Sequence, residues 1–431
     1  MNICIIGAGH VGLVSGACFA DLGNNVICVD SDKKKIKHLK SGRMPIYEPG
    51  LEELVKRNVM EGRLTFGSMV KEGVRKSDVI FICVWTPPKN GGEADLTYVE
   101  DVSRQIALSM PSYRLIVEKS TVPVNTGEWV ERTVKEFNKR GIRFDVASNP
   151  EFLREGSAIE DFMHPDRIVL GVKSKKARDL LVELYKPINA PVVITDIKSA
   201  EIIKHASNSF LAAKISFINA VANICDKVGA DVIEVAKGMG LDKRIGEKFL
   251  EAGVGFGGSC FPKDLSAFLR ISEKAGYEFG MLKETERINQ EQRRLFVNKI
   301  EELVWNLSDK TIGMLGLSFK PDTDDIRQAP SIDIISMLLK EGAKVKVFDP
   351  EAMDKVKALF RKDVRFCKDA YMVARDSDCL AVVTDWNEFK DLDFKRIKKL
   401  MKRPAVVDGR NIYDPAEMKK LGFRYVGMGR K

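Results

Sequence analysis

The sequence has few of the residues that build metal sites or disulfide frameworks. Its 431 residues include eight cysteines and only four histidines. No two cysteines form a Cys-x-x-Cys pair, and the histidines are isolated, without metal-ligand spacing. Most of the cysteines lie in apolar stretches, where a free thiol packs as a small core residue. We therefore expect no metal, and a reduced protein of the cytoplasm.

Long apolar runs and charge of one sign are also missing. No apolar run approaches the roughly 20 residues that a membrane span needs. The chain begins with a strand-like segment instead of a basic stretch followed by an apolar one, so we expect no secretory signal. The net charge is +9, but 70 basic residues are scattered among 61 acidic ones. We expect neither membrane nor nucleic-acid binding, and instead a pocket for an anionic substrate.

What the chain does contain is two regions of alternating strand-like and helical patterns. The strand-like runs lie at 2–6, 25–30, 78–84, 115–119 and 144–147, and then at 311–317, 343–348, 379–384 and 405–407. Buried parallel strands separated by helices are typical of a doubly wound sheet. Between the two regions, residues 199–228 keep a 3.6-residue apolar period without Gly or Pro. Further helices are expected at 232–238, 263–275 and 284–305.

The predicted fold class is therefore α/β, with two Rossmann-like doubly wound domains. They are joined by a long central helix and a helical dimerisation region. We place the first domain at residues 1–198, the helical domain at 199–305 and the second Rossmann-like domain at 306–431.

A glycine-rich turn joins the first strand-like run to the helix that follows it. Gly7, Gly9 and Gly12 have the Gly-x-Gly-x-x-Gly spacing, and the second run ends at Asp30. This spacing permits a tight turn and lets a pyrophosphate approach the helix N-terminus. An acid about 20 residues further on accepts hydrogen bonds from ribose hydroxyls and repels a 2′-phosphate, which favours NAD over NADP. FAD uses the same motif, so the turn alone predicts a dinucleotide site and not its chemistry.

A second glycine-rich stretch surrounds one cysteine, in the sequence GFGGSCFPKD at residues 255–264. Pro262 suits the first turn of a helix, so we expect Cys260 at a helix N-terminus with Lys263 nearby. Both features stabilise a thiolate. Lys204 and Asn208, four residues apart, share one face of the long helix and can donate to an oxyanion. On these residues alone, a structural cysteine and a reactive thiol both stay open.

Taken in order along the chain, these motifs resemble those of the UDP-glucose/GDP-mannose dehydrogenase family. The matching segments are 7–12 with Asp30, 47–51, 86–87, 120–123, 149–156, Glu201 with Lys204 and Asn208, 255–264, 316–320, 323–327 and 408–410. The resemblance implies two hydride transfers to NAD and a covalent intermediate on Cys260. Similarity at 162–167 favours UDP-glucose, oxidised to UDP-glucuronate. UDP-N-acetylmannosamine, UDP-galactose, GDP-mannose and a non-catalytic NAD-binding sensor stay open as alternatives.

The resemblance also implies roles for single residues. The implied catalytic set is Cys260, Lys204, Asn208, Asp264, Thr121 and Glu151. Implied NAD contacts come from Gly7, Gly9, Val11, Gly12, Asp30, Lys35, Thr86, Thr121, Glu155, Lys263 and Arg327. Implied UDP-sugar contacts come from Glu151, Phe152, Leu153, Lys204, Asn208, Arg244, Phe249, Gly257, Phe319, Lys320 and Arg410. Arg244 matches an arginine that reaches the neighbouring subunit's sugar site, which implies a functional homodimer. Three positions depart from the family pattern. The family usually has a small residue in place of Trp85, often a glycine in place of Asn125, and commonly Glu-Ser in place of residues 328–329.

Overall fold

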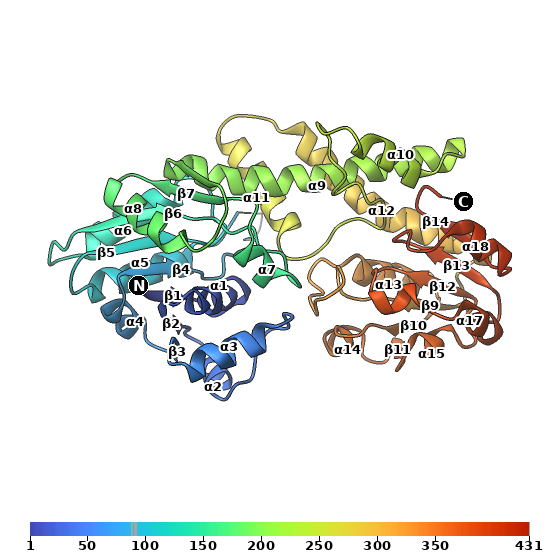
Figure 1. Cartoon of the computed structure of the whole chain (residues 1–431). Coiled ribbons are helices and arrows are strands. Elements are labelled where there is room, and N and C mark those ends of the chain that lie inside the picture. Colours follow the sequence, from blue (N-terminus) through green and yellow to red (C-terminus); the bar gives the residue numbers. More distant parts are fainter. Residues whose placement is uncertain (88, 90–92, 431) are drawn as a thin grey trace. The chain divides into compact units, whose positions relative to one another are not determined.

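The computed structural model describes residues 1–87, 89 and 93–430, and it consists of two compact units. Unit 1 contains Met1–Ser207 and Ser266–Gly276, and unit 2 contains Asn208–Leu265 and Tyr277–Lys431. Each unit has its own sheet (Figure 1) and its own clusters of buried hydrophobic residues. In the part of the chain that the structure describes, no helix combines the length and the apolar character needed to cross a bilayer.

Unit 1 is built on an eight-stranded sheet of order β3-β2-β1-β4-β5-β6-β7-β8. Its strands are β1 (Asn2–Ile6), β2 (Asn25–Val29), β3 (Leu64–Gly67), β4 (Val79–Ile82), β5 (Arg114–Glu118), β6 (Phe144–Ser148), β7 (Ile168–Val172) and β8 (Val192–Thr195). Its helices are α1 (His10–Asp21), α2 (Lys33–Lys40), α3 (Leu51–Met60), α4 (Val70–Lys76), α5 (Thr97–Ser109), α6 (Thr126–Phe137), α7 (Ala158–Met163) and α8 (Lys175–Tyr185). All neighbouring strands pair in parallel except β6 and β7, which are antiparallel.

The β1 strand shows why this sheet is covered on both faces. Ile3 and Ile5 point into one core, which also contains residues of α1, and Cys4 and Ile6 point into another, which contains residues of α5. Successive side chains of a strand point to opposite faces, so a strand buried on both sides reads as one continuous apolar run. This is the doubly wound arrangement that the sequence predicts.

Unit 2 contains a six-stranded parallel sheet of order β11-β10-β9-β12-β13-β14, which repeats the order of the first six strands of unit 1. Its strands are β9 (Thr311–Leu315), β10 (Lys344–Phe348), β11 (Val364–Phe366), β12 (Cys379–Val382), β13 (Ala405–Asp408) and β14 (Arg424–Gly427). Helices α13 (Pro330–Lys340), α14 (Met353–Phe360), α15 (Ala370–Ala374), α16 (Asn387–Lys390), α17 (Phe394–Leu400) and α18 (Pro415–Lys420) accompany it. The second Rossmann-like fold is thereby confirmed.

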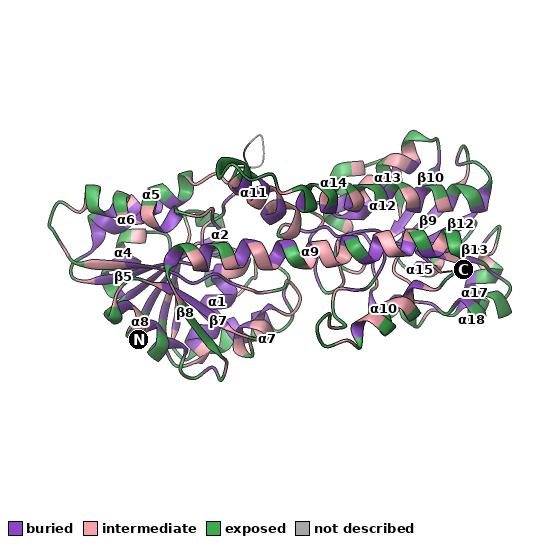
Figure 2. Ribbon diagram, turned by 90° about the horizontal axis from the view of Figure 1, so that it is seen from above, coloured by how far each residue is buried: buried purple, intermediate pink, exposed green. Residues whose placement is uncertain are grey.

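Four helices lie between the two sheets in sequence. They are α9 (Ile197–Val228), α10 (Val232–Gly240), α11 (Phe261–Lys274) and α12 (Gly280–Val304). The 32 residues of α9 confirm the predicted long helix, which begins two residues earlier than the apolar period suggests. Figure 2 shows buried, intermediate and exposed residues alternating along α9, as expected for a helix with one face on a core.

Candidate active site

The glycine turn after β1 has the shape that a bound pyrophosphate requires. Gly7 has a φ of +104°, a conformation that L side chains rarely adopt. A Cβ at Gly12 would lie 1.8 Å from the carbonyl oxygen of Gly7, so only glycine allows α1 to pack this closely. A Cβ at Gly9, directly before α1, would meet nothing within 4 Å. The N-terminus of α1 therefore faces open space, where its N–H groups favour an anion.

Asp30 follows β2 and is held against this turn. Its Oδ2 accepts hydrogen bonds from the Ala8 N–H at 2.8 Å and from Lys35 Nζ at 2.8 Å. Its Oδ1 accepts one from the Asp32 N–H at 2.9 Å. Val11, on the first turn of α1, packs against the core and contributes no polar group. A carboxylate fixed beside the glycine turn fits a dinucleotide whose ribose hydroxyls donate to it.

The neighbouring strands β4 and β5 bring two threonines to the same edge of the sheet. The carboxyl ends of parallel strands meet at one edge, where ligands of open α/β sheets bind. Thr86, beyond β4, donates from Oγ1 to the carbonyl oxygen of Thr121, beyond β5, at 3.0 Å. The structure thus brings Thr86 and Thr121 together at the edge that carries the glycine turn.

The loop after β6 carries a buried ion pair. Glu151 Oε1 lies 3.1 Å from Lys204 Nζ of α9, and both side chains are buried. The second carboxylate oxygen of Glu151 accepts the Leu153 N–H at 2.6 Å. Lys204 Nζ also lies 5.3 Å from the centre of the Phe152 ring. A buried charge is tolerated when it is paired and hydrogen-bonded, as it is here.

Glu48 holds the other end of this loop, near Glu155, through contacts that the sequence motifs do not reveal. Its carboxylate accepts the N–H groups of Gly156 at 2.8 Å and of Ala158 at 2.7 Å. His10 Nε2, at the start of α1, lies 2.8 Å from the same carboxylate. Glu48 therefore ties the 149–156 loop to the helix that follows the glycine turn.

Glu201, three residues before Lys204 on α9, holds the start of helix α6. Glu201 accepts the N–H groups of Asn125 at 2.7 Å and Gly127 at 2.8 Å, at the start of α6. Burial raises the pKa of Glu201 to about 7, against the lowering effect of these two hydrogen bonds. Asn125 has a φ of +77°, which asparagine tolerates better than other L residues, so this departure from a family glycine keeps the turn.

Cys260 differs from the seven other cysteines because its side chain is exposed while theirs are buried. Burial raises the pKa of thiols such as Cys83 and Cys379 to about 12, which keeps them protonated and unreactive. Cys260 directly precedes α11, and its carbonyl oxygen accepts the Asp264 N–H at 2.8 Å. The predicted place of this thiol, at a helix N-terminus, is confirmed.

Two predicted catalytic residues lie together beside this helix start. Asn208 Nδ2 donates to Asp264 Oδ2 at 2.6 Å, and both side chains are buried. Lys263 Nζ lies 3.1 Å from the other carboxylate oxygen of Asp264. The buried carboxylate of Asp264 is thereby fixed from two sides, four residues after the thiol.

The glycine run before Cys260 packs closely against residues of the second Rossmann-like fold. A Cβ at Gly257 would lie 2.3 Å from the carbonyl oxygen of Gln328, and one at Gly258 would lie 2.8 Å from the Phe319 ring. Arg410 donates to the carbonyl oxygens of Gly255 at 3.5 Å and Phe319 at 3.3 Å. The structure therefore brings Gly257, Phe319 and Arg410 together at this glycine run.

The remaining predicted residues of unit 2 lie around this group or at the surface. Lys320 Nζ is 5.8 Å from the Phe319 ring centre, and Arg327 pairs with Asp325 at 2.6 Å. Phe249 has a φ of +66° and its ring centre lies 6.2 Å from that of Phe261. The Arg244 side chain is 89 % exposed and pairs with Asp242 at 2.6 Å.

The six predicted catalytic residues are divided equally between the two units. Thr121, Glu151 and Lys204 lie in unit 1. Asn208, Cys260 and Asp264 lie in unit 2. Within the described residues, no group of three or more His, Cys, Asp or Glu side chains has an arrangement able to hold a metal ion.

The strand order of unit 1, its glycine turn and Asp30 define a dinucleotide-binding Rossmann fold. Unit 2, whose sheet repeats the order of the first six strands, carries an exposed thiol at a helix N-terminus. These features place the chain in the class of dinucleotide-dependent oxidoreductases.

The chain belongs to the UDP-glucose/GDP-mannose dehydrogenase family. Three family models match it in order: the NAD binding domain at residues 1–189, the central domain at 198–291 and the UDP binding domain at 313–415. The predictions of a nucleotide-sugar dehydrogenase and of NAD as the cofactor are thereby confirmed.

Similar proteins from several organisms cover the whole chain. A UDP-glucose 6-dehydrogenase of Bacillus subtilis (strain 168) is 49% identical over 100% of this chain and 93% of its own length. The structure of a UDP-glucose dehydrogenase from the archaeon Pyrobaculum islandicum has a TM-score of 0.94 and 40% identity, over 100% of this chain and 98% of that one. A UDP-D-ManNAc dehydrogenase structure from Pyrococcus horikoshii has a TM-score of 0.88 and 28% identity, over 100% and 99% of the two chains.

Proposed function

We propose that this protein oxidises UDP-glucose to UDP-glucuronate, with two NAD+ and one water consumed per sugar. The single observation that carries the proposal is the exposed Cys260 at the start of α11, with the buried Asn208–Asp264 pair beside it. The full-length likeness to UDP-glucose 6-dehydrogenases supports the choice of sugar.

Cys260 is the proposed nucleophile for the aldehyde at C6 of the sugar. The partial positive charge of the α11 N-terminus favours the thiolate. Its sulfur adds to the aldehyde carbon and forms a thiohemiacetal, which loses a hydride and becomes a thioester. Bound NAD+ supplies the hydride acceptor in each of the two oxidations. Water then cleaves the thioester and releases the carboxylate and the free thiol.

The other residues of the catalytic set stabilise charge and move protons in this proposal. Lys204 and Asn208 donate to the oxyanions that form at C6. Asp264 and Thr121 hold the water that takes and returns protons, and Glu151 assists thioester hydrolysis. The Glu151–Lys204 pair supports this division, because it places the carboxylate and the ammonium 3.1 Å apart in a buried setting.

The two ligands are assigned to the two Rossmann-like folds. We assign NAD to Gly7, Gly9, Val11, Gly12, Asp30, Lys35, Thr86, Thr121, Glu155, Lys263 and Arg327. We assign the UDP-sugar to Glu151, Phe152, Leu153, Lys204, Asn208, Arg244, Phe249, Gly257, Phe319, Lys320 and Arg410. The open N-terminus of α1 and the packing of Phe319 and Arg410 on the glycine run support these assignments.

We also propose a homodimer, in which Arg244 reaches the partner's sugar site. Phe210, Phe217 and Ile224 of α9 are exposed at seven-residue intervals, which places them on one helix face.

A reactive thiol needs a reducing compartment, so we propose that the protein lies in the cytoplasm. We propose that the chain has three functional domains: the NAD-binding domain at residues 1–198, the helical domain at 199–305 and the UDP-sugar-binding domain at 306–431.

The alternative substrates are UDP-N-acetylmannosamine, UDP-galactose and GDP-mannose, and the higher identity to UDP-glucose 6-dehydrogenases supports UDP-glucose over them. Recognition of one sugar substituent is worth only about 1–3 kcal/mol in a pocket. The test is NADH formation with a panel of UDP-glucose, UDP-galactose, UDP-N-acetylmannosamine and GDP-mannose, each at limiting concentration. We expect the highest kcat/KM and two NADH per sugar with UDP-glucose. Activity with UDP-N-acetylmannosamine and none with UDP-glucose contradicts the proposed substrate.

A further inference from the structure

The arm that leads to Cys260, residues 252–258, is buried although it belongs to no helix or strand. Backbone N–H and C=O groups that are buried outside secondary structure need other partners. In this arm, three asparagine side chains from three different elements of unit 2 supply many of them.

Asn289 of α12 makes the most complete contact with the arm. Its Oδ1 accepts the N–H of Phe256 at 2.7 Å, and its Nδ2 donates to the carbonyl oxygen of the same residue at 3.0 Å. The carboxamide therefore pairs with Phe256 as a neighbouring strand would. The backbone is shaped around it: Gly255 has a φ of +94°, and a Cβ there would lie 2.5 Å from Asn289 Oδ1.

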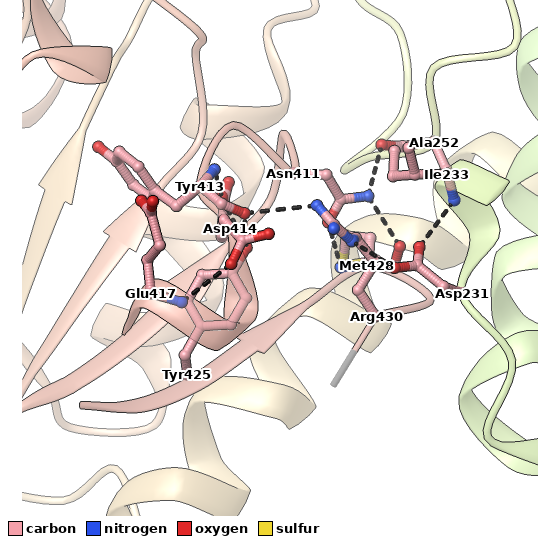
Figure 3. Close-up of polar contacts among 11 residues, drawn as sticks. Asp231, Ile233, Ala252, Asn411, Tyr413, Asp414, Glu417, Tyr425, Met428 and Arg430 are labelled. Atoms are coloured by element: carbon pink, nitrogen blue, oxygen red, sulfur yellow. Dashed lines mark hydrogen bonds and ion pairs between the residues drawn. The ribbon is translucent and has the colours of Figure 1, made fainter. Parts of the chain in front are cut away.

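Two more asparagines hold the beginning of the arm. Asn219 of α9 accepts the Gly253 N–H at 2.8 Å through Oδ1. Asn411, after β13, donates from Nδ2 to the carbonyl oxygens of Ala252 at 3.3 Å and Met428 at 2.9 Å (Figure 3). Asn411 thus joins the arm to the turn that carries Arg410.

We infer that Asn289 is a positioning residue for the Cys260 thiol, with Asn219 and Asn411 as its supports. The inference rests on the proposed function of Cys260. Asn289 fixes Phe256 four residues before the thiol, and the glycines that follow have no side chains of their own to hold the chain. Removing the carboxamide takes away both of its hydrogen bonds to Phe256 and leaves the longer one from Arg293 at 3.3 Å and that of the Gly258 N–H to the Arg327 carbonyl oxygen at 2.9 Å. We therefore expect the sulfur to keep its position less tightly.

The first test is Asn289→Ala in the full-length enzyme, measured as kcat and KM for UDP-glucose. A misplacement of about 1 Å costs on the order of 10²-fold in rate, so we expect a loss of that size in kcat. KM should change less than kcat, because of the residues assigned to the UDP-sugar only Gly257 lies next to the backbone that Asn289 holds. Asn411→Ala should lower kcat and also raise KM, because it loosens the Arg410 turn.

The matched control is Asn138→Ala in unit 1. Asn138 makes the same pair of hydrogen bonds with one backbone residue, Ile142, at 2.7 and 3.1 Å. A merely structural asparagine affects the melting temperature and leaves kcat of the folded enzyme unchanged. Equal kcat values for Asn289→Ala and Asn138→Ala overturn the inference.

Asn289→Asp gives a signature that structural damage does not produce. A protonated carboxyl has the shape of the carboxamide, donates to Phe256 O and accepts its N–H, whereas the ionised form has lost the donor. Burial favours the protonated form, and the buried guanidinium of Arg293, which donates to the same Phe256 oxygen at 3.3 Å, favours the ionised form. The ratio of variant to wild-type kcat should therefore rise as pH falls, and a ratio independent of pH contradicts the inference. If the wild-type enzyme itself fails to oxidise UDP-glucose, the proposed function is wrong, and that outcome is distinct from both of these.

Discussion

Cys260 is exposed at the start of a helix, and this local setting leads to the first prediction. We expect Cys260→Ser to block complete turnover, because a serine hydroxyl is a weaker nucleophile and its ester hydrolyses more slowly than a thioester. The measurement is NADH formed from limiting UDP-glucose. The control is Cys225→Ser, which changes a buried thiol outside the site. Unchanged turnover in Cys260→Ser would remove the covalent step from the mechanism.

Lys204 is buried against Glu151, and its replacement tests the oxyanion role. Loss of one donor to an oxyanion costs on the order of 10²–10³ in rate, so we expect Lys204→Ala to lower kcat by that factor. Lys198→Ala is the matched control, because Lys198 lies on the same helix and pairs at the surface with Glu128 at 3.1 Å. A change within about twofold, typical of a surface residue, would assign Lys204 to the scaffold alone.

At the scale of elements, α9 has an apolar line that unit 2 leaves uncovered. Phe210, Phe217 and Ile224 are 61, 54 and 58 % exposed. Large apolar side chains exposed along one face of a helix are typical of a protein interface. We expect light scattering to give a mass of twice 48.3 kDa for the wild type and 48.3 kDa for Phe217→Asp.

The control for this prediction is Leu108→Asp on α5, a leucine that is 60 % exposed in unit 1. This variant should keep the dimer. If Arg244 completes the partner's site, Phe217→Asp should also raise KM for UDP-glucose. A monomeric wild type, or a Phe217→Asp protein that is still dimeric, contradicts the role of this helix face.

Glu201 links α9 to the start of α6, and its titration predicts how stability depends on pH. Burial raises its pKa from 4.5 to about 7. The native state therefore binds this proton more tightly than the unfolded state does. The associated stabilisation is complete below about pH 4.5 and is lost as pH rises through about 7.

The measurement is the melting temperature of wild type and Glu201→Gln across this pH window. We expect the wild-type melting temperature to fall more steeply as pH rises. Glu136→Gln, at an exposed position on α6, should follow the wild type. Parallel curves for wild type and Glu201→Gln would show that Glu201 titrates as it does in the unfolded chain.

The elements that the sequence predicts well are those with a strong local signal. The long apolar period gives α9, and the glycine turn with the acid after β2 gives the cofactor edge. Strands β3, β7, β8, β11 and β14 are not among the predicted runs. β3 and β8 have only four residues each, and the β8 residues are mostly exposed, so neither leaves a long apolar run. β7 pairs antiparallel with β6, which the alternating pattern of a parallel sheet does not suggest.

The site residues, like the elements, are predictable from the sequence only where the signal is local. Cys260 and Asp264 are neighbours in sequence, and Pro262 marks the helix start between them, so their arrangement is predictable. The supports of the site are not. Glu48 holds Gly156 across 108 residues, and Asn411 reaches Ala252 across 159 residues. Lys119 is buried, and burial lowers its pKa to about 8 while it donates to Asn149 at 3.0 Å. Such pairs depend on tertiary packing, and no local pattern contains them.

At the scale of the whole molecule, the chain has two folds of one strand order and two ligand assignments. The family models divide the sequence in the same sense, with an NAD binding domain first and a UDP binding domain last. In the N-terminal fold, we assign the dinucleotide to the edge where β1, β2, β4 and β5 end. The C-terminal fold packs Phe319 and Arg410 against the glycine run that ends at the thiol.

The central claim is that the sugar carbon becomes covalently bound to Cys260 during turnover. The most direct measurement is mass analysis of enzyme that is acid-quenched during turnover of UDP-glucose with NAD+, followed by digestion. We predict a UDP-glucuronyl adduct on the peptide that contains Cys260, formed by the wild type and absent from Cys260→Ser. Full turnover without any adduct on that peptide, together with an active Cys260→Ser enzyme, would contradict the account.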